Sequence, residues 1–184
     1  MQRNGINRKR IIIEIVFSIL AVVLIVVDQV TKTVCKNNFK NNGWTSTTVI
    51  DGFLYFSYAF NTGAAWSFLA GVSWAQTFFK ILTVVALAVF FVYYVFICKK
   101  NYKLLRVGVI FIISGTIGNF IDRVAYGGVV DFISVLLPTG KFFPTFNMAD
   151  SYMTVGIIIL FIHYLFIDKN ALFGKKDGNK TIDG

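Results

Sequence analysis

Four long runs of apolar residues constrain this chain more than any other feature of its sequence. A helix that crosses the roughly 30 Å hydrocarbon core of a bilayer needs about 20 mostly apolar residues. Runs of about this length cover residues 11–30, 75–98, 104–121 and 151–167. The fourth run is short, and we expect its helix to extend back into the preceding N-M-A-D segment. The sequence therefore predicts an all-α polytopic membrane protein with four transmembrane helices, organised as one membrane domain over residues 1–184.

Basic residues flank the apolar runs and predict how the chain is oriented. Cytoplasmic flanks of membrane proteins are enriched in Lys and Arg. Twelve such residues lie in the N-terminal segment, the turn between the second and third runs, and the tail at 169–184, whereas five flank the runs on the opposite side. We therefore expect both termini in the cytoplasm. The net charge of +9 follows from this topology, so we expect no nucleic-acid partner.

Two longer segments are expected on the extracytoplasmic side. The first, residues 33–74, contains the aromatic-rich and partly alternating stretch Phe53–Phe60, a pattern that favours short β-strands. An open sheet edge cannot face lipid, so these strands must lie at the membrane surface or against the helices. In the second segment, residues 122–150, we expect the part after Asp131 to be loop-like.

Several kinds of catalytic site are excluded by the residue types present. Cys35 and Cys98 fall on opposite sides of the membrane, which rules out a disulfide, and neither has a partner at zinc-site spacing. The single histidine, His163, lies near the cytoplasmic end of the last run and is expected to be a packed or interfacial side chain. No serine occupies a G-x-S-x-G turn. We therefore expect neither a metal nor a cofactor.

Carboxylates remain as candidates for chemistry. Four of the nine acidic residues gather at the extracytoplasmic ends of the runs: Asp28, Asp122, Asp131 and Asp150. Ionisable residues in membrane spans are candidates for function. Two carboxyl groups held close together cannot both ionise, so they share a proton. The ionised group can then take a proton from water while the protonated group polarises a peptide carbonyl. The residue pattern alone does not select which two of the four form such a pair.

Each of these aspartates also has a purely structural interpretation. Asp28 and Lys32 are spaced i, i+4 on one helix face, where they can pair with each other or help to shape a site. Asp122 and Arg123 end the third run, where they can anchor the helix end, and Arg123 can meet a lipid phosphate or a substrate. Asp131 can be a strand-end residue after a Gly-Gly turn. A fifth aspartate, before Gly52, is expected in a turn.

Two further patterns concern the third and fourth runs. Gly115, Asn119 and Asp122 are spaced i, i+4, i+7 and share one helix face, which suits a buried contact between helices. Asn147 precedes Asp150 by three residues, as expected for the N-cap of a helix with an acidic first turn.

Five short segments give the chain a family resemblance. They are D-Q-V-T-K at 28–32, N-T-G-A-A-W-S at 61–67, G-T-I-G-N-F-I-D-R at 115–123, V-V-D-F at 129–132 and F-P-T-F-N-M-A-D-S at 143–151. In these segments and in their order, the chain resembles lipoprotein signal peptidase, the bacterial enzyme that removes signal peptides from lipid-modified prolipoproteins. The resemblance extends from the first apolar run to the fourth, and no motif position departs from the family pattern.

The resemblance implies a fold, a reaction and a set of site residues. The fold is four spans with a small extracytoplasmic β-cradle, at about residues 33–74, and an interfacial helix. The reaction is aspartic endopeptidase cleavage N-terminal to a lipidated cysteine, with Asp131 and Asp150 as the catalytic pair. The remaining matched positions imply substrate-binding or supporting roles for Asp28, Lys32, Asn61, Gly63, Asn119, Asp122, Arg123, Asn147 and Ala149. The expected partners are prolipoproteins with a lipid-modified cysteine and membrane lipids. We expect a monomer in the bacterial plasma membrane, with its site near the extracytoplasmic face.

Two other classes of protein place aspartates near membrane helices. A transporter or proton-pathway protein relays protons or binds cations, with carboxylates near the bilayer midplane and often in repeated halves. Here the carboxylates gather at one interface, and no repeat is present. A non-catalytic assembly subunit uses polar residues to join helices. Nothing in that interpretation requires four aspartates beside several asparagines at one end of the spans.

Overall fold

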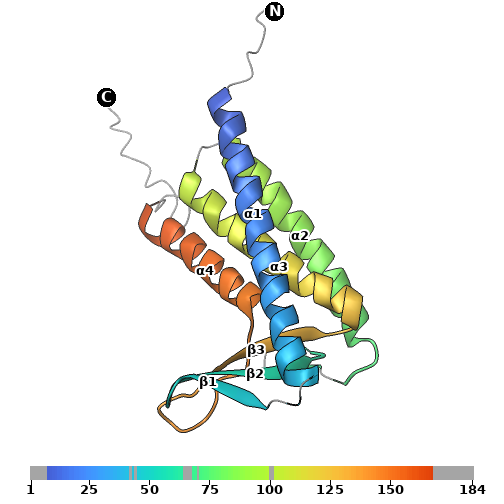
Figure 1. Ribbon diagram of the computed structural model, residues 1–184. Helices are drawn as coiled ribbons and strands as arrows, with labels where there is room; N and C mark the ends of the chain where they lie inside the picture. Colours follow the sequence, from blue (N-terminus) through green and yellow to red (C-terminus); the bar gives the residue numbers. More distant parts are fainter. Residues whose placement is uncertain are drawn as a thin grey trace, which may run out of the picture.

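The computed structural model of the protein describes residues 8–41, 43, 45–63, 68–69, 71–99 and 102–167. The predicted tail at 169–184 therefore lies outside the described residues. Four helices, each long and apolar enough to cross a membrane, form the bundle drawn in Figure 1: α1 (Arg8–Cys35), α2 (Ala75–Lys99), α3 (Lys103–Tyr126) and α4 (Met148–Ile162). Short π-helical turns continue two of them: η1 (Lys36–Asn41) after α1 and η3 (His163–Ile167) after α4. α4 begins within the N-M-A-D segment, as the sequence predicted.

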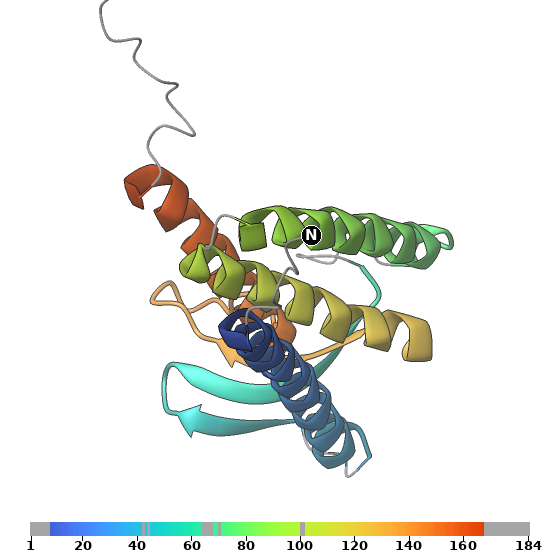
Figure 2. The ribbon, with the colours of Figure 1, turned by 90° about the horizontal axis from the view of Figure 1, so that it is seen from above.

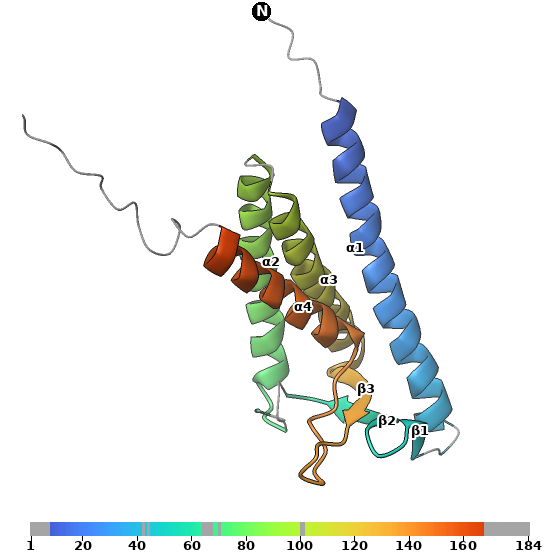
Figure 3. The ribbon, with the colours of Figure 1, turned by 90° about the vertical axis from the view of Figure 1, so that its left-hand side faces the viewer.

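Most of α1 presents apolar side chains outward, along one side of the bundle (Figure 3). Its buried residues, Asp28, Lys32 and Cys35, all lie in its last turns and on one face. Towards its other end, the Glu14 carboxylate pairs with the Arg106 guanidinium of α3 at 2.6 Å. Polar contacts thus attach α1 to α3 near both ends. Such contacts matter in a membrane, where an apolar helix face gains little by exchanging lipid for protein.

α3 is the central helix and approaches α4 closely (Figure 2). Glycines permit this approach. A Cβ atom on Gly115 would lie 2.3 Å from the carbonyl oxygen of Ala149, and one on Gly156 would lie 2.5 Å from that of Gly108. Small residues at such positions let helix backbones come together in a membrane. The predicted buried face containing Gly115 is thereby confirmed.

A three-stranded antiparallel sheet closes one end of the bundle, which we call the sheet end. Its strands are β1 (Ser46–Ile50), β2 (Leu54–Asn61) and β3 (Val129–Val135), in the order β1-β2-β3. The turn between β1 and β2 contains Asp51 and Gly52, whose φ of +69° suits glycine, as predicted. The prediction of a loop directly after Asp131 is wrong, because β3 continues to Val135. It pairs with β2 in a register that places Asp131 opposite Ala59.

The chain turns sharply from α3 into β3. Gly127 caps α3 in the left-handed conformation, with φ +74° and ψ +18°. At Gly128, a Cβ atom would lie 2.7 Å from the Phe60 ring, so the start of β3 can lie tightly against β2. Asp131 consequently lies in the middle of a paired strand and not at a strand end.

The sheet packs against the end of α1 through a small apolar cluster. Cys35, Phe39 and Phe132 are its buried members, and Phe56 meets Phe132 edge to face at 5.9 Å. The interfacial helix implied by the family resemblance has no counterpart among the described residues between β2 and α2, which form turns and bends, so it stays a prediction. At the opposite end of the bundle, His163 is buried between the rings of Tyr102 and Tyr164, which confirms the prediction of a packed side chain.

Candidate active site

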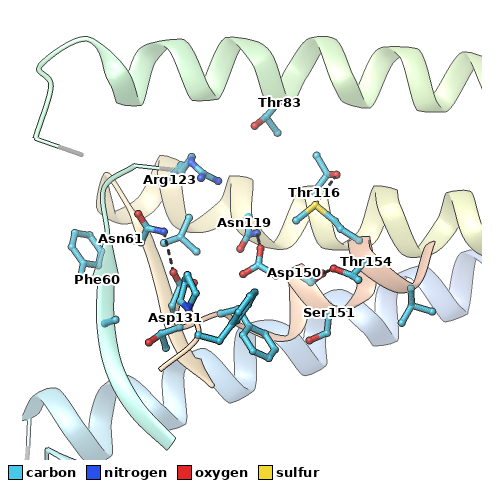
Figure 4. A pocket seen from close by; sticks show the side chains of 18 of the residues that line it. Phe60, Asn61, Thr83, Thr116, Asn119, Arg123, Asp131, Asp150, Ser151 and Thr154 are labelled. Carbon is cyan, nitrogen blue, oxygen red and sulfur yellow. Dashed lines mark hydrogen bonds between the residues drawn. The ribbon is translucent and has the colours of Figure 1, made fainter. Parts of the chain in front are cut away.

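Asp131 and Asp150, which lie 19 positions apart in the sequence, meet at the wall of one cavity of about 970 Å³ at the sheet end (Figure 4). Asp131 comes from β3 and Asp150 from the first turn of α4. The cavity wall also includes Asn61, Asn119 and Arg123. Residues from β2, β3, α3 and α4 therefore converge on one pair of carboxyl groups.

Asn147 contacts both carboxyl groups. Its side-chain Nδ2 donates to Asp131 Oδ1 at 2.7 Å, and its backbone N–H donates to Asp150 Oδ2 at 3.1 Å. Its Oδ1 accepts from the backbone N–H of Asp150 at 3.0 Å, which makes Asn147 the N-cap of α4, as predicted. The cap that starts the helix is thus also the bridge between the two aspartates.

Two further carboxamides each hold one carboxyl group, as the dashed lines in Figure 4 mark. Asn61 Nδ2 donates to Asp131 Oδ2 at 3.1 Å, and its Oδ1 accepts from the backbone N–H of Gly63 at 2.9 Å. Asn119 Nδ2 donates to Asp150 Oδ1 at 2.8 Å. Each carboxyl group therefore has at least two N–H donors, a number that offsets part of the cost of burying it.

Two other aspartates hold the backbone beside the pair. Asp28 Oδ1 accepts from the backbone N–H of Ala149 at 2.9 Å, one residue before Asp150. Asp122 Oδ2 accepts from the backbone N–H of Val130 at 3.0 Å, one residue before Asp131. Asp28 and Asp122 thus act on the segments that carry the pair and do not line the cavity.

Lys32 joins these two aspartates. Its ammonium group lies 2.9 Å from Asp28 Oδ2 and 3.4 Å from Asp122 Oδ2, and only 3% of its side chain is exposed. It also donates to Asn119 Oδ1 at 2.9 Å. The predicted ion pair between Asp28 and Lys32 is therefore confirmed, and their contribution to the site stays a prediction.

Arg123 is the cation that lines the cavity. Its Nη2 donates to the carbonyl oxygen of Gly63 at 3.3 Å, and its guanidinium carbon lies 5.4 Å from the centroid of the Phe79 ring. Its Nε has no hydrogen-bond partner among the described residues. That Nε is buried, but Arg123 lines the cavity, so its guanidinium can donate to a carbonyl or phosphate oxygen of a bound molecule.

Burial gives Asp131 an unusual proton affinity. Removal from water, together with the neighbouring Asp150 carboxylate, raises the pKa of Asp131 from its ordinary 3.8 to about 7. Hydrogen bonds from Asn61 and Asn147 and the charge of Lys32 oppose this rise in pKa. Near neutral pH, Asp131 consequently retains a proton that an ordinary aspartate has lost, as a general acid requires.

The cavity continues between α2, α3 and α4 as a largely apolar arm. Three threonines line this arm, one from each helix: Thr83, Thr116 and Thr154. Each hydroxyl donates to a carbonyl oxygen four residues earlier in its own helix, at 2.7 to 2.9 Å. Their donors are thus satisfied within the helices, and the arm remains suited to an apolar group. Val155 and Ile157 line it and are exposed on the outside of α4, so the arm borders the lipid-facing surface.

Five of the eleven predicted site residues line the cavity: Asn61, Asn119, Arg123, Asp131 and Asp150. Gly63, Lys32 and Asn147 are hydrogen-bonded to members of this wall. Asp28 and Asp122 pair with Lys32 one contact farther out, and the backbone N–H of Ala149 donates to Asp28.

Two contributors to this site were not singled out from the sequence. Gln29 Nε2 donates to Asp122 Oδ1 at 3.2 Å and to the Gly118 carbonyl oxygen at 3.1 Å. A Cβ atom on Gly118 would lie 2.5 Å from Asp28 Oδ2. Gln29 lies inside the motif segment D-Q-V-T-K, and Gly118 lies inside G-T-I-G-N-F-I-D-R. Membership of these segments was the only signal in the sequence that could have identified the two residues.

Comparisons with known proteins agree with the motifs. The family model described as signal peptidase (SPase) II matches residues 20–166. The lipoprotein signal peptidase of Bacillus velezensis is 41% identical over 150 residues, which cover 82% of this chain and 94% of that protein. The lipoprotein signal peptidase of Staphylococcus carnosus is 40% identical over 152 residues, with 83% and 91% covered. A bacterial membrane enzyme solved by the in meso method at 2.3 Å resolution is similar with a TM-score of 0.70 at 35% identity, over 90% of this chain and 94% of that one.

Proposed function

The chain belongs to the signal peptidase II family, and from this premise we propose that it removes signal peptides from prolipoproteins by aspartic proteolysis, with Asp131 and Asp150 as the reacting carboxyl groups. One observation carries the choice of this pair. Of the four aspartates that the sequence places at the extracytoplasmic ends of the apolar runs, Asp131 and Asp150 line the cavity, whereas Asp28 and Asp122 bind backbone amides behind it.

The two carboxyl groups divide the work of hydrolysis. Asp150, as the ionised member, takes a proton from a water molecule while the water oxygen attacks the scissile carbonyl carbon. Asp131, as the protonated member, gives its proton to the carbonyl oxygen, so a neutral gem-diol forms. Collapse of this intermediate breaks the C–N bond. The proton held by Asp150 goes to the leaving nitrogen, and a diol proton returns to Asp131, so the pair ends as it began.

Several contacts support this division of roles. The raised pKa of Asp131 suits it to hold the proton near neutral pH. With the proton on Asp131, the carboxylate of Asp150 is stabilised by N–H donors from the Asn119 side chain and the Asn147 backbone. Arg123 offers N–H groups in the same cavity and can hold a carbonyl oxygen of the substrate backbone.

The orientation in the membrane follows from the charge distribution. We place the sheet end on the extracytoplasmic side and both termini in the cytoplasm, because twelve basic residues flank the opposite end and five flank the sheet end. The single membrane domain then carries its site near the outer surface, where water reaches it. One chain supplies every residue of the pair and its supports, so we propose a monomeric enzyme.

The substrate class can be tested directly with a mobility-shift assay on purified protein. A diacylglyceryl-modified prolipoprotein is expected to be cleaved, and the unmodified precursor is not, because the apolar arm between α2, α3 and α4 can receive an acyl chain next to the aspartates. The released fragment is identified by mass spectrometry, which checks that cleavage lies N-terminal to the modified cysteine. Failure of the folded protein to cleave either form would contradict the proposed function.

The pH dependence of cleavage provides a second test. The value of kcat/KM is expected to fall above about pH 7, approaching tenfold per pH unit, because the raised pKa of Asp131 means that its proton is lost there. The profile is measured with the modified prolipoprotein at subsaturating concentration. A rate that stays constant from pH 6 to pH 9 would contradict the assignment of Asp131 as the proton donor.

A further inference from the structure

The carboxamides around the aspartate pair share one arrangement. Asn61, Asn119 and Asn147 each turn the NH₂ group toward a carboxyl oxygen of the pair. In each case, a donor on the opposite side holds the amide oxygen. For Asn61 the donor is the backbone N–H of Gly63, and for Asn147 it is the backbone N–H of Asp150. Because backbone groups cannot rotate away, these two carboxamides are held in one orientation.

Asn119 is held differently. Its Oδ1 accepts from the Lys32 ammonium group at 2.9 Å and from Asn147 Nδ2 at 3.1 Å. An ammonium group has only donors, so it can face the oxygen of a carboxamide and never its NH₂ group. Hydrogen bonds from a charged donor are roughly twice as strong as neutral ones. The orientation of Asn119 therefore depends mainly on a side chain that reaches in from α1, 87 residues earlier in the chain.

A rotated Asn119 would present its oxygen to Asp150 Oδ1. Two acceptors would then face each other, and a proton between them would relieve the repulsion. The shared proton would move from Asp131 to Asp150, which is the wrong member for attack by water. The lysine does not line the cavity, so apart from its charge it can act on the reaction through this carboxamide.

We propose that Lys32 is a positioning residue whose ammonium group fixes the Asn119 carboxamide with its NH₂ group toward Asp150, and so keeps the shared proton on Asp131. This inference rests on the proposed function. It goes beyond an ion pair, because Lys32 then controls which carboxyl group is the base.

The charged groups around the pair come from four elements. They are Asp28 and Lys32 of α1, Asp122 and Arg123 of α3, Asp131 of β3, and Asp150 of α4. Lys32 is the cation that touches Asn119. Removing it changes both the charge near the pair and the amide orientation, and an experiment must separate these two effects.

A double-mutant cycle between Lys32→Met and Asn119→Ala separates them. In the wild-type background, Lys32→Met is expected to lower kcat about 100-fold, because a misplaced reacting group has an effect of this size. KM is expected to stay within about threefold of the wild-type value. Its acidic pH limb is expected to move upward by about one pH unit, since a positive charge is lost. In the Asn119→Ala background, the same substitution is expected to lower kcat by less than about threefold, because the intermediary is gone.

Arg106→Met is the matched control. It removes another buried cation, which pairs with the partly exposed Glu14 far from the cavity, so it tests the effect of losing an ion pair between α1 and α3. It is expected to lower the melting temperature without moving the pH profile or kcat. If Lys32→Met does not fold, the same cycle is run in an Asp122→Asn background. The two substitutions together leave the group of Asp28, Lys32 and Asp122 with the same net charge as in the wild type.

Each outcome decides the inference. Equal losses of kcat in both backgrounds would show that Lys32 acts by charge alone and would overturn the role proposed here. A folded Lys32→Met variant with wild-type kcat and pH profile would also overturn it. A wild-type protein that fails to cleave contradicts the proposed function itself, whereas a cleaving wild-type protein with an unaffected Lys32→Met variant contradicts only the role of the lysine.

Discussion

Asp131→Asn and Asp150→Asn are each expected to abolish cleavage of a diacylglyceryl-modified prolipoprotein while the protein remains folded and inserted. An asparagine has nearly the shape of an aspartate, but it can neither accept a proton from water nor give one to a carbonyl oxygen. Removing a general acid or base costs about 10²- to 10⁴-fold, and the loss is near the upper limit when two groups act as a unit. The measurement is the initial rate of product formation by mobility shift.

Asp51→Asn is the matched control for these two substitutions. It makes the same chemical change in the exposed turn between β1 and β2, away from the cavity, and the rate is expected to stay at the wild-type value. If either Asp131→Asn or Asp150→Asn cleaves at the wild-type rate, the assignment of the pair is wrong.

The Asp131→Asn variant also has an expected signature in stability. Because the pKa of Asp131 is raised to about 7 from 3.8, the folded protein binds this proton more tightly than the unfolded chain does. The carboxyl group therefore lowers the free energy of unfolding progressively as the pH rises from about 4 to about 7. Asparagine does not titrate. The melting temperature of the variant should accordingly fall less than that of the wild type over this pH range.

Gly115→Ala is expected to have the second largest effect. The added Cβ atom would lie 2.3 Å from the Ala149 carbonyl oxygen and 2.8 Å from Met153 Cγ. A backbone oxygen cannot rotate aside, so the first turn of α4 must move away from α3. That turn carries Asp150, which would be displaced from Asn119. We expect a loss of about 100-fold in kcat and of about 1–3 kcal/mol in stability.

Gly108→Ala is the matched control at the same helix interface. Its Cβ atom would meet mainly side-chain atoms, Leu160 Cδ1 at 2.6 Å and Ile159 Cγ2 at 2.9 Å, two turns farther from the sheet end. We expect a loss of stability with kcat within about threefold of the wild type. Steady-state kinetics and thermal melting in detergent distinguish the two variants. Wild-type kcat in Gly115→Ala would show that the site tolerates movement of α4.

The sequence was sufficient for the features that depend on neighbours along the chain. A membrane helix must satisfy its own backbone hydrogen bonds within one apolar segment, so hydropathy identified the four helices. The N-cap at Asn147 and the turn at Gly52 follow from the conformational preferences of single residues. β2 was predicted because its aromatic residues alternate. Only the family motifs, and no periodicity, singled out Asp131 and Asp150 from the four aspartates.

β3 was not predicted because its stability comes from partners that lie elsewhere. Its residues, V-V-D-F-I-S-V, have no alternating pattern, since both faces are largely covered. The strand forms because the Gly127 cap reverses the chain and because β2 pairs with it across about 70 positions of sequence. The same pairing places Asp131 beside Asn61.

By itself, the sequence determined the apolar helices, the N-cap of α4 and the residue types available for chemistry, because each depends on local preference or on transfer from water to lipid. Only the tertiary structure decided what those residues do. Asp28 and Asp122 look like Asp131 and Asp150 in sequence, yet they bind backbone amides behind the cavity wall. Lys32 reaches Asn119 across 87 positions. Hydrogen bonds act over about 3 Å in space, whatever the separation along the chain, so this division of roles emerges only when α1, α3, β3 and α4 are packed together.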